Sequence, residues 1–270
     1  MNHKYFLTLI LLVSMFISGF GQANKVDHSK QAIICLTYDD GLQSHLATVL
    51  PELDSTGLKG TFFLNSIQGS SEVIGEASPA NTGWTNAATH GHELGNHTLF
   101  HACPEKFGWK KAFAIESYTV DRIITEVTTE NIILSLLDPN RKRRAFAFPC
   151  NNFLIHDTDY TTIIKTQGLV KYARAGGDRN SFVSDFKQID IMKMPSWTVE
   201  EGTTTDELIA FAEKIKKVNG MGIYQFHGVG AEFFQISKET HKAFLNYLKT
   251  HQDEYWVTTF SDAMDYITSK

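Results

Sequence analysis

Three groups of polar residues in this sequence have the types and spacing to carry out chemistry. The first is the pair Asp39 and Asp40 within Thr37–Gly41, which follows the apolar run Ala32–Leu36. Two adjacent carboxylates repel each other unless a cation or a proton intervenes, so the pair indicates a metal ligand beside an acid–base group. An Asp-Asp-Gly turn that caps a helix is the alternative interpretation.

The second group contains two histidines, His97 and His101, at positions i and i+4. This spacing predicts that both imidazoles lie on one side of a helical turn, close enough to share a metal ion. Together with one aspartate of the pair they would form a three-ligand set that leaves positions open for water and substrate. By itself, the His-x-x-x-His spacing is equally compatible with an ordinary surface helix.

The third group centres on His227, which ends the apolar run Ile223–Phe226 and precedes Gly228-Val229-Gly230. A histidine at the end of a strand is exposed at the edge of a sheet, where it can exchange a proton near neutral pH. A purely structural histidine is the alternative.

The elements that must position these groups alternate along the chain. Apolar or β-branched runs predict strands at Ala32–Tyr38, Thr61–Leu64, Ala145–Phe148, Leu169–Tyr172, Ile189–Met194, Ile223–Phe226 and Trp256–Thr258. Amphipathic stretches predict helices at Leu46–Leu53, Tyr118–Leu137, Asp206–Val218, His241–Lys249 and Asp262–Ile267, with a capping box from Thr204 to Glu207 and Ser261 as the last cap. This alternation predicts an α/β fold with a mostly parallel sheet, closed as one barrel domain. The stretch Ser66–Thr89, rich in small and polar residues, is expected to be a surface insertion near the site.

Composition restricts the class of protein. The 270 residues include 42% apolar residues, and 25 Lys+Arg against 30 Asp+Glu give a formal charge of −5. The apolar fraction is enough for a globular core, and no basic footprint indicates a nucleic-acid partner. The sequence contains no G-x-S-x-G, G-x-G-x-x-G or P-loop motif, which disfavours a serine hydrolase and a nucleotide-binding enzyme.

The first residues predict export. Residues 1–21 have the pattern of a signal peptide, with Lys4, the apolar run Phe6–Ile17 and a small-x-small cleavage site, followed by an N-terminal segment at 22–31. The apolar run is shorter than the ~20 residues of a membrane span and no lipid-attachment cysteine follows it, so we expect a secreted or periplasmic protein without a stable membrane anchor. In an oxidising compartment Cys103 and Cys150, both beside candidate motifs, could pair, whereas three free thiols including Cys35 are the alternative.

Taken in order, Thr37–Gly41, the stretch His92–Thr98 with His101, and the strand ending in His227 resemble the motifs of the polysaccharide deacetylase family (NodB-homology, carbohydrate esterase family 4). The similarity runs from about Ala32 to Ile267, so 32–270 is expected to be the catalytic domain. The resemblance implies a single distorted (β/α) barrel with seven or eight mostly parallel strands. It also implies removal of acetyl groups from N-acetylated, less often O-acetylated, sugars of a polysaccharide or oligosaccharide. One divalent metal ion would be the cofactor, Zn²⁺ first and Co²⁺ or Ni²⁺ as alternatives.

The resemblance also implies roles for particular residues. Asp39 would be the general base, His227 the general acid, and Asp40, His97 and His101 the metal ligands. The backbone N–H of Tyr38 would donate to the oxyanion. Candidate substrate-binding residues are Phe148, Pro149 and Trp197; Phe148 and Trp197 would form a stacking wall for a sugar ring, with ordinary core packing as the alternative.

Two departures from the family pattern leave the function open. The family often has an arginine before the proline of its third motif, where this chain has Phe146–Asn151, so Arg144 or Arg174 would have to hold the base. The fourth motif usually offers an aspartate beside a tryptophan, where this chain reads Met194–Trp197, so Glu200 or a water would have to orient His227. Besides an N-deacetylase, the sequence is therefore compatible with an O-acetyl esterase or with a glycan-binding protein that keeps the metal but has lost turnover.

Overall fold

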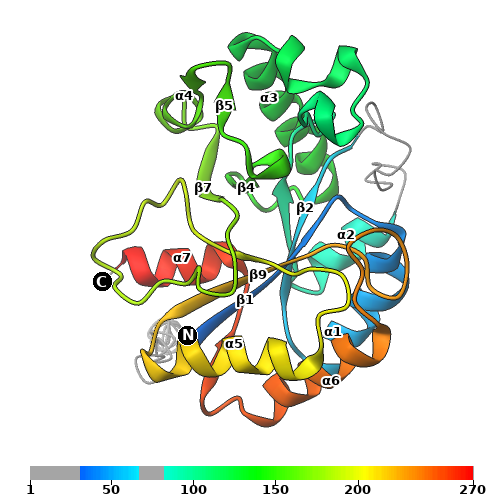
Figure 1. Cartoon of the computed structure of the whole chain (residues 1–270), viewed down its shortest axis with the longest axis vertical. Helices are drawn as coiled ribbons and strands as arrows, with labels where there is room; N and C mark the ends of the chain where they lie inside the picture. Colours follow the sequence, from blue (N-terminus) through cyan, green and yellow to red (C-terminus); the bar gives the residue numbers. More distant parts are fainter. Residues whose placement is uncertain (1–30, 67–81, 270) are drawn as a thin grey trace, which may run out of the picture.

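The fold is that of a computed structural model in which residues 31–66 and 82–269 are described (Figure 1). The predicted signal peptide and most of the N-terminal segment lie outside these residues. Among the helices of the described ranges, none combines the length and the apolar character needed to cross a membrane.

A single parallel sheet forms the centre of the molecule. Its strands are β1 (Ala32–Asp39), β2 (Gly60–Leu64), β3 (Glu93–Asn96), β4 (Arg144–Ala147), β7 (Val170–Arg174), β8 (Trp197–Thr198), β9 (Met221–Phe226) and β10 (Tyr255–Val257). They run in the order β7-β4-β3-β2-β1-β9-β8, with β10 paired to β1. The sheet is curled into a half-barrel (Figure 1), which confirms the distorted (β/α) barrel of seven or eight mostly parallel strands. Within the described residues, β7 is linked to the segment before β8 through an isolated bridge between Arg174 and Met194.

Strand β1 lies at the middle of this sheet. All eight of its residues are buried. It pairs with β9 along one edge, and along the other its first half pairs with β10 and its second half with β2. A parallel strand covered on both faces requires a continuous apolar run, and Ala32–Leu36 supplies it. The same burial places the polar residues at the end of the run inside the protein.

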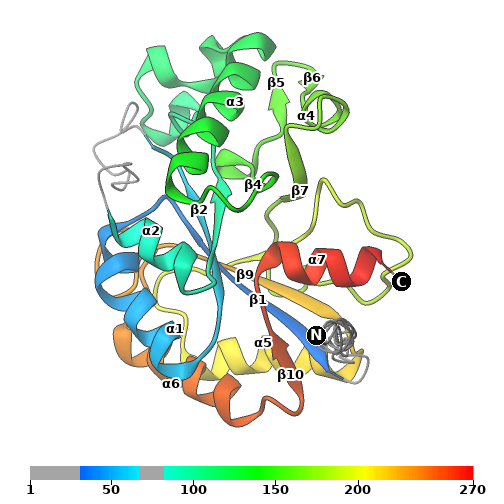
Figure 2. The same cartoon turned by 180° about the vertical axis from the view of Figure 1, so that it is seen from behind.

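Helices cover the sheet on both sides. They are α1 (Leu50–Thr56), α2 (Thr82–Thr89), α3 (Val120–Leu137), α4 (Thr161–Thr166), α5 (Thr205–Lys217), α6 (Lys238–Thr250) and α7 (Phe260–Thr268). Short helical turns lie at His45–Val49, Glu105–Phe107, Lys111–Phe113, Ile115–Ser117 and Pro149–Asn151, and a small antiparallel pair joins β5 (Leu154–Ile155) to β6 (Thr158–Asp159). Helices α1, α5 and α6 lie together at one end of the sheet, and α3 and α4 lie at the other (Figures 1 and 2).

Several sequence predictions need correction. The predicted strand Ile189–Met194 is an irregular segment of turns, with a single bridge at Met194. The last helix begins at Phe260 and is capped by the Thr259 side chain instead of Ser261, whereas the capping box of Thr204 and Glu207 on α5 is confirmed. Of the predicted insertion Ser66–Thr89, the final residues form α2, and 67–81 lie outside the described residues.

Strand β3 was not predicted, because Glu93-Leu94-Gly95-Asn96 shows neither an apolar run nor alternation. All four residues are buried nonetheless. The Glu93 carboxylate accepts hydrogen bonds from the Ser261 N–H (2.9 Å) and the Thr61 hydroxyl (3.0 Å). A buried charge is tolerated when its lone pairs are satisfied in this way. Glu93 thereby joins β2 and β3 to the start of α7.

A second buried carboxyl group, Glu130 on α3, accepts hydrogen bonds from the N–H (3.1 Å) and the hydroxyl (2.9 Å) of Ser66, just beyond β2. Burial raises the pKa of Glu130 to about 8, although both hydrogen bonds lower it. The folded protein therefore keeps this group protonated at neutral pH, while the unfolded chain releases the proton above about pH 4.3.

This difference predicts a pH-dependent stability. Between about pH 4.3 and the folded pKa the unfolded chain binds fewer protons, so the free energy of unfolding should fall as pH rises, by up to ~1.4 kcal/mol per pH unit from this group. Glu130→Gln removes that titration. In urea unfolding, the free energy of unfolding of the variant should rise relative to that of the wild type between pH 5 and pH 8. A constant difference between the two free energies would contradict the assignment.

Candidate active site

The chemically important residues meet at the carboxyl edge of the sheet. Asp39 ends β1, His97 follows β3, Arg174 ends β7 and His227 follows β9. In parallel α/β folds this edge is where ligands bind. A cavity of about 470 Å³ lies there, and its lining includes Asp39, Asp40, His97, His101, Phe107, Trp109, Cys150, Asn151, Thr198, Gln225, His227, Phe233 and Phe234.

The aspartate pair faces the cavity because the backbone turns sharply at the end of β1. Successive side chains of a strand point to opposite faces, so two neighbouring residues cannot normally reach one site. Asp40, however, has φ 76° and Gly41 has φ 61°, and the Asp40 N–H donates to the Phe63 carbonyl (3.0 Å). Aspartate is among the few residues that tolerate this left-handed conformation. The turn therefore brings both carboxylates to the same cavity.

Asp40, His97 and His101 come together as the sequence motifs predict. Asp40 Oδ1 lies 3.5 Å from His97 Nε2 and 3.1 Å from His101 Nε2, and the two Nε2 atoms are 3.1 Å apart. All three side chains are almost fully buried. These atoms form a compact triangle in which each side chain contributes one ligand atom.

The two histidines do not lie on a helical turn, which corrects the sequence interpretation. They belong to the loop after β3, in which Thr98 has φ 63° and His101 has φ 50°. Local hydrogen bonds hold this loop: the Thr98 N–H donates to Asn96 Oδ1 (2.8 Å) and the His101 N–H to the Thr98 hydroxyl (3.1 Å). The i, i+4 spacing still brings the rings together, with centroids 4.5 Å apart, but through a side-chain-stabilised loop.

The protonation of the rings fits a metal ion. His97 Nδ1 lies 2.8 Å from the Ala147 carbonyl, which can only accept, so Nδ1 carries the hydrogen and Nε2 has a free lone pair. Burial and the neighbouring His101 lower the pKa of His97 to about 4, and burial lowers that of His101 to about 4, so both rings are neutral at neutral pH.

The triangle matches the ligand spacing of zinc. Asp40 Oδ1 is buried and accepts no hydrogen bond from the described residues. Tetrahedral Zn²⁺ with bonds of about 2.0–2.1 Å separates its ligand atoms by about 3.3 Å. The observed separations of 3.1 to 3.5 Å agree with that value. One carboxylate and two imidazoles therefore fit a zinc ion and leave coordination positions for small molecules.

Asp39 is held by a different set of partners. Its Oδ2 accepts from Arg174 Nη2 (2.5 Å) and Gln225 Nε2 (3.0 Å), while its buried Oδ1 has no hydrogen-bond partner within the described chain. Burial alone would raise the pKa of Asp39, but the Arg174 guanidinium, together with His97 and His227, holds the pKa below its usual value. Asp39 is therefore ionised, with one oxygen free to take a proton.

For Asp40 the balance is reversed. Burial raises its pKa, and the negative charge of Asp39 adds to this, while His97 and His227 lower it only in part. Asp40 would be ionised at little cost only with a cation beside it. The two carboxylates are thus differentiated by their surroundings into one ionised group and one that requires a positive partner.

The structure decides which arginine supports the base. The buried guanidinium of Arg174, at the end of β7, contacts Asp39. Arg144 is also buried, but it is the first residue of β4 and so lies away from the carboxyl edge of the sheet. It binds Asp138 Oδ2 (2.8 Å). Of the two candidates, Arg174 is therefore the one that contacts Asp39.

His227 lies beside the ligand triangle, with Nε2 at 3.9 Å from Asp40 Oδ2. Its ring contacts Phe233 and Phe234, with centroid distances of 5.7 and 5.4 Å. Nδ1 is buried, and none of the described residues hydrogen-bonds to it. Glu200, expected to orient this ring, is exposed and lines a neighbouring hollow instead. The His227 side chain is therefore held by aromatic packing, and its Nδ1 has no carboxylate partner in the described part of the chain.

His45 supports His227 through the backbone, which sequence reasoning missed. The Leu42 N–H donates to His45 Nδ1 (3.2 Å), so the other nitrogen, Nε2, carries the hydrogen and donates to the His227 carbonyl (2.9 Å). Burial lowers the pKa of His45 to about 4, so the ring is neutral and keeps this tautomer. The segment after β1 thereby fixes the position of the segment after β9.

The predicted substrate-binding residues lie in the core. Phe148 is 0% and Trp197 1% exposed; Phe148 packs against Phe146, and Trp197 against Phe211. Phe148 therefore packs in the core away from the cavity, whereas Trp197, although almost fully buried, lines a neighbouring hollow of about 310 Å³. Pro149 is buried beside them. The Tyr38 side chain binds His241 Nε2 (2.9 Å), and its backbone is paired with Phe62 and Phe226 on two neighbouring strands.

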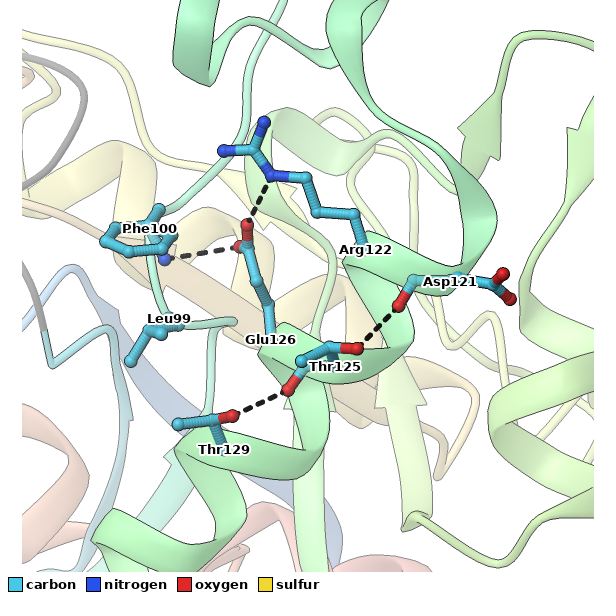
Figure 3. Close-up of a pocket in the computed structure, with 7 residues that line it drawn as sticks. All are labelled: Leu99, Phe100, Asp121, Arg122, Thr125, Glu126 and Thr129. Carbon is cyan, nitrogen blue, oxygen red and sulfur yellow. Dashed lines mark hydrogen bonds and ion pairs between the residues drawn. The ribbon is translucent and has the colours of Figure 1, made fainter.

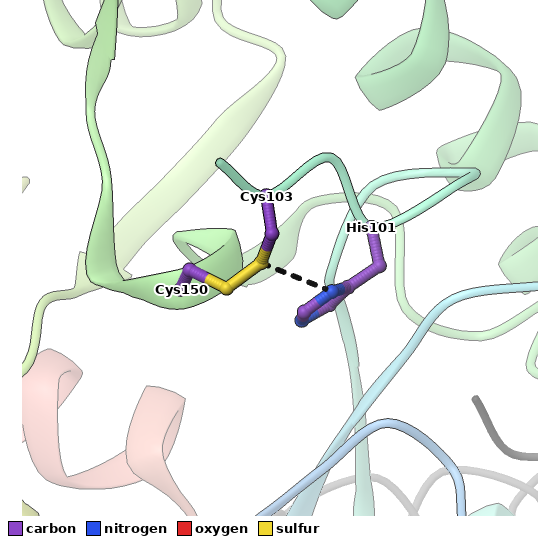
Figure 4. Close-up of side chains that lie close together, drawn as sticks. All are labelled: His101, Cys103 and Cys150. Carbon is purple, nitrogen blue, oxygen red and sulfur yellow. Dashed lines mark hydrogen bonds between the residues drawn. A yellow bond between two sulfur atoms is a disulfide. The ribbon is translucent and has the colours of Figure 1, made fainter. Parts of the chain in front are cut away.

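A disulfide joins Cys103, two residues after a candidate ligand, to Cys150 in the turn after β4 (Figure 4). Of the two alternatives for the cysteines, the structure has the Cys103–Cys150 bridge and a buried free thiol at Cys35. Cys103 Sγ lies 3.6 Å from His101 Nδ1. The bridge therefore ties the loop that carries both histidines to the loop after β4.

Glu126 on α3 holds the same loop from the other side (Figure 3). Its carboxylate accepts from the Phe100 N–H (3.3 Å) and pairs with Arg122 (3.4 Å). These residues border a hollow of about 350 Å³ between the loop and α3. The position of His101 is thus determined by contacts on both sides of the loop.

Comparisons with known proteins agree with this architecture. The sequence matches the model of the polysaccharide deacetylase family over residues 26–168, just over half of the chain. The match includes Asp39, Asp40, His97 and His101 and ends before Arg174 and His227. A search of curated proteins found no match.

Solved structures share the fold at low sequence identity. Peptidoglycan deacetylase PdaC from Bacillus subtilis superimposes with a TM-score of 0.56 at 15% identity, covering 90% of this chain and 94% of that chain. The catalytic domain of a peptidoglycan N-acetylglucosamine deacetylase from Eubacterium rectale gives 0.52 at 16% identity, covering 85% and 90%. A protein from Mycobacterium smegmatis, provisionally assigned as a polysaccharide deacetylase, gives 0.62 at 13% identity, covering 89% and 91%.

The parallel half-barrel thus carries at its carboxyl edge an arginine-held aspartate beside an Asp-His-His triangle that could hold a metal ion. With the sequence match added, the chain belongs to the polysaccharide deacetylase family.

The triangle predicts how metal binding responds to mutation. Asp40→Ala and His97→Ala each remove one of three ligands, so zinc affinity should fall by more than the ~10–100-fold typical of an outer-shell change. His227→Ala is the matched control, because it removes a neighbouring histidine outside the triangle and should bind zinc as the wild type does. Equilibrium dialysis with zinc measures this directly. Binding that survives the loss of Asp40 would contradict the site.

Proposed function

We propose that the chain is an exported, metal-dependent deacetylase that removes acetyl groups from the N-acetylated sugars of a polysaccharide. The observation that carries this proposal is the contrast between the two aspartates. Asp39 is held ionised by Arg174 with one oxygen free, and Asp40 joins two neutral imidazoles in a set that fits zinc. A general base beside a set of metal ligands, here at the end of β1, is suited to hydrolysis of an acyl group.

The residues of the chain would have the following roles in the reaction. A bound divalent ion would supply Lewis-acid activation of water and of the acetyl carbonyl. Arg174 and Gln225 occupy Asp39 Oδ2, so Oδ1 is the oxygen that takes the proton from the attacking water. His227 then gives a proton to the sugar nitrogen as its bond to the acetyl carbon breaks. The products are acetate and a free amino sugar.

Export is part of the proposal. It is supported by the signal-peptide pattern of residues 1–21 and by the disulfide between Cys103 and Cys150, since disulfides persist mainly in oxidising compartments. The expected partner is thus an acetylated polysaccharide or oligosaccharide outside the cytoplasm.

An O-acetyl esterase is the second candidate, and one atom favours it. His227 Nδ1 has no hydrogen-bond partner among residues 31–66 and 82–269, so no carboxylate orients the ring through that nitrogen. An alkoxide leaves more easily than an amine anion, so an ester needs less help from the acid. A glycan-binding protein that keeps the metal without turnover is the third candidate, on the same observation.

Acetate release separates these candidates. Zinc-loaded protein should release acetate from N-acetylated chitin oligomers or peptidoglycan, and Asp39→Asn should lower kcat by about 100-fold or more because the base is lost. His227→Ala should lower kcat on the amide substrates while zinc stays bound. Release from acetylated xylan alone would favour the esterase, and glycan binding with no release above the Asp39→Asn background would favour the binding protein.

Arg174 and Arg144 give a matched pair of variants. Both arginines are buried and paired with an aspartate, so Arg174→Met and Arg144→Met should each cost about 3–5 kcal/mol of stability. Only Arg174→Met also removes the group that keeps Asp39 ionised, and we expect it to lower kcat per folded molecule by about 100-fold. Chemical unfolding gives the folded fraction and acetate release gives kcat. Equal kcat in the two folded variants would show that Arg174 has only a structural role.

A further inference from the structure

Two buried donors hold Asp39, and one short segment of the chain contacts both of them. Arg174 and Gln225 donate to the same oxygen, Asp39 Oδ2, at 2.5 and 3.0 Å. Each donor side chain also binds a hydroxyl group: Arg174 binds Ser196, and Gln225 binds Thr198. These hydroxyls lie just before β8 and at its end. The proposed reaction assigns no role to either of them.

Ser196 fixes the guanidinium of Arg174. The Ser196 side chain is fully buried, and its Oγ accepts a hydrogen bond from Arg174 Nη1 (3.2 Å). The same hydroxyl donates its one hydrogen to the Ala175 carbonyl (2.7 Å), which leaves its lone pairs for the arginine. Because the guanidinium is planar and rigid, the contact at Nη1 also sets the direction in which Nη2 points toward Asp39.

Thr198 fixes the amide of Gln225 in a corresponding way. A carboxylate only accepts hydrogen bonds, so Gln225 must turn its nitrogen toward Asp39 and its Oε1 away. The Thr198 hydroxyl donates to this Oε1 (2.9 Å) and accepts from Asn151 Nδ2 (3.5 Å). Ser196 Oγ lies 3.3 Å from the same Oε1. Thr198 thus stabilises the one orientation of Gln225 in which the amide donates to the base.

The register of the sheet accounts for these contacts. Strand β8 pairs with β9 in parallel, and Thr198 lies opposite Gln225. Residues two apart in an extended segment point to the same side. Ser196 and Thr198 therefore both point toward the donors of the base, whereas Trp197 between them packs against Phe211. The segment that lacks a carboxylate beside Trp197 thereby supplies hydroxyl groups to the partners of the base.

We infer that Ser196 and Thr198 are positioning residues for the base: they hold Arg174 and Gln225 in the orientations that occupy Asp39 Oδ2, so that Oδ1 stays available to the attacking water. This inference rests on the proposed function, in which Asp39 is the general base. It predicts that loss of either hydroxyl lowers kcat without changing KM or zinc affinity, because both hydroxyls act on the base through another side chain.

Thr198 allows the sharpest substitution test. Thr198→Val has nearly the same shape but no hydroxyl, whereas Thr198→Ser keeps the hydroxyl. On N-acetylated chitin oligomers, zinc-loaded Thr198→Val should show kcat per folded molecule lowered about 2- to 10-fold, the effect of one lost hydrogen bond, with KM unchanged. Thr198→Ser should restore the wild-type kcat. A higher KM with an unchanged kcat would show that Thr198 contacts the substrate instead and would contradict the inference.

Ser196 is tested against a matched serine. Ser261 is also buried, and its hydroxyl donates to the buried carboxylate of Glu93, but it lies on α7 and is not part of the cavity lining. Ser196→Ala should lower kcat by a factor similar to that of the valine variant, whereas Ser261→Ala should lower stability alone. Chemical unfolding gives the folded fraction of each variant. Equal kcat values per folded molecule in these two variants would refute a positioning role for Ser196.

Side-chain NMR keeps this inference separate from the proposed function. If the zinc-loaded wild type releases no acetate from any substrate, the deacetylase proposal fails, and spectra of the metal-free protein then judge the contacts. The side-chain NH2 signals of Gln225, assigned by their loss in Gln225→Met, should shift in Thr198→Val and return to their wild-type positions in Thr198→Ser. Gln225 signals that are identical in Thr198→Val and in the wild type overturn the inference, even if acetate is released normally.

Discussion

Two adjacent carboxylates buried at the end of a central strand impose the constraint on which the site depends. Neither can be left without compensation, because a buried charge without a partner is costly. The chain compensates each differently: Asp39 receives a guanidinium and an amide, and Asp40 faces two neutral imidazoles. The pKa of Asp39 is therefore lowered and that of Asp40 raised. Divergent environments of this kind assign separate roles to two chemically identical groups.

Maintaining this contrast requires loops that are fixed at the carboxyl edge of the sheet. The backbone is left-handed at Asp40, His101 and Cys150, which lie in the loops after β1, β3 and β4. Conformations of this kind persist only where surrounding contacts determine them. Those contacts are present: the disulfide joins the second and third loops, Glu126 holds the second to α3, and His45 holds the segment after β9.

The sequence alone predicted the parts of the fold in which a functional motif follows a recognisable strand pattern. The apolar runs of β1 and β9 located the strands that carry Asp39 and His227, and the family motifs named the ligand triangle. Strand β3 could not be predicted, because its buried Glu93 depends on partners in distant segments. The choice of Arg174 over Arg144 could not be predicted either, because it depends on which strand ends reach the cavity. Likewise Phe148 and Phe107 are the same residue type, and only tertiary packing separates the core ring from the exposed one.

Asp39, the base of the proposed reaction, has more supporting contacts than His227, the proposed acid. Arg174 reaches Asp39 from β7, so the arginine missing from the third motif is replaced by one from another strand and the base keeps its partner. At His227 no residue of the described chain hydrogen-bonds to Nδ1; aromatic rings and a backbone hydrogen bond from His45 hold this segment in place, and the neighbouring carboxylate, Asp40 Oδ2, lies 3.9 Å from Nε2. In the proposed reaction, removal of a proton from water is therefore supported by more contacts than protonation of the leaving group, so the leaving group is the step at which the chemistry of the substrate would matter most. The difference between an amide and an ester substrate thus depends on a single nitrogen, His227 Nδ1.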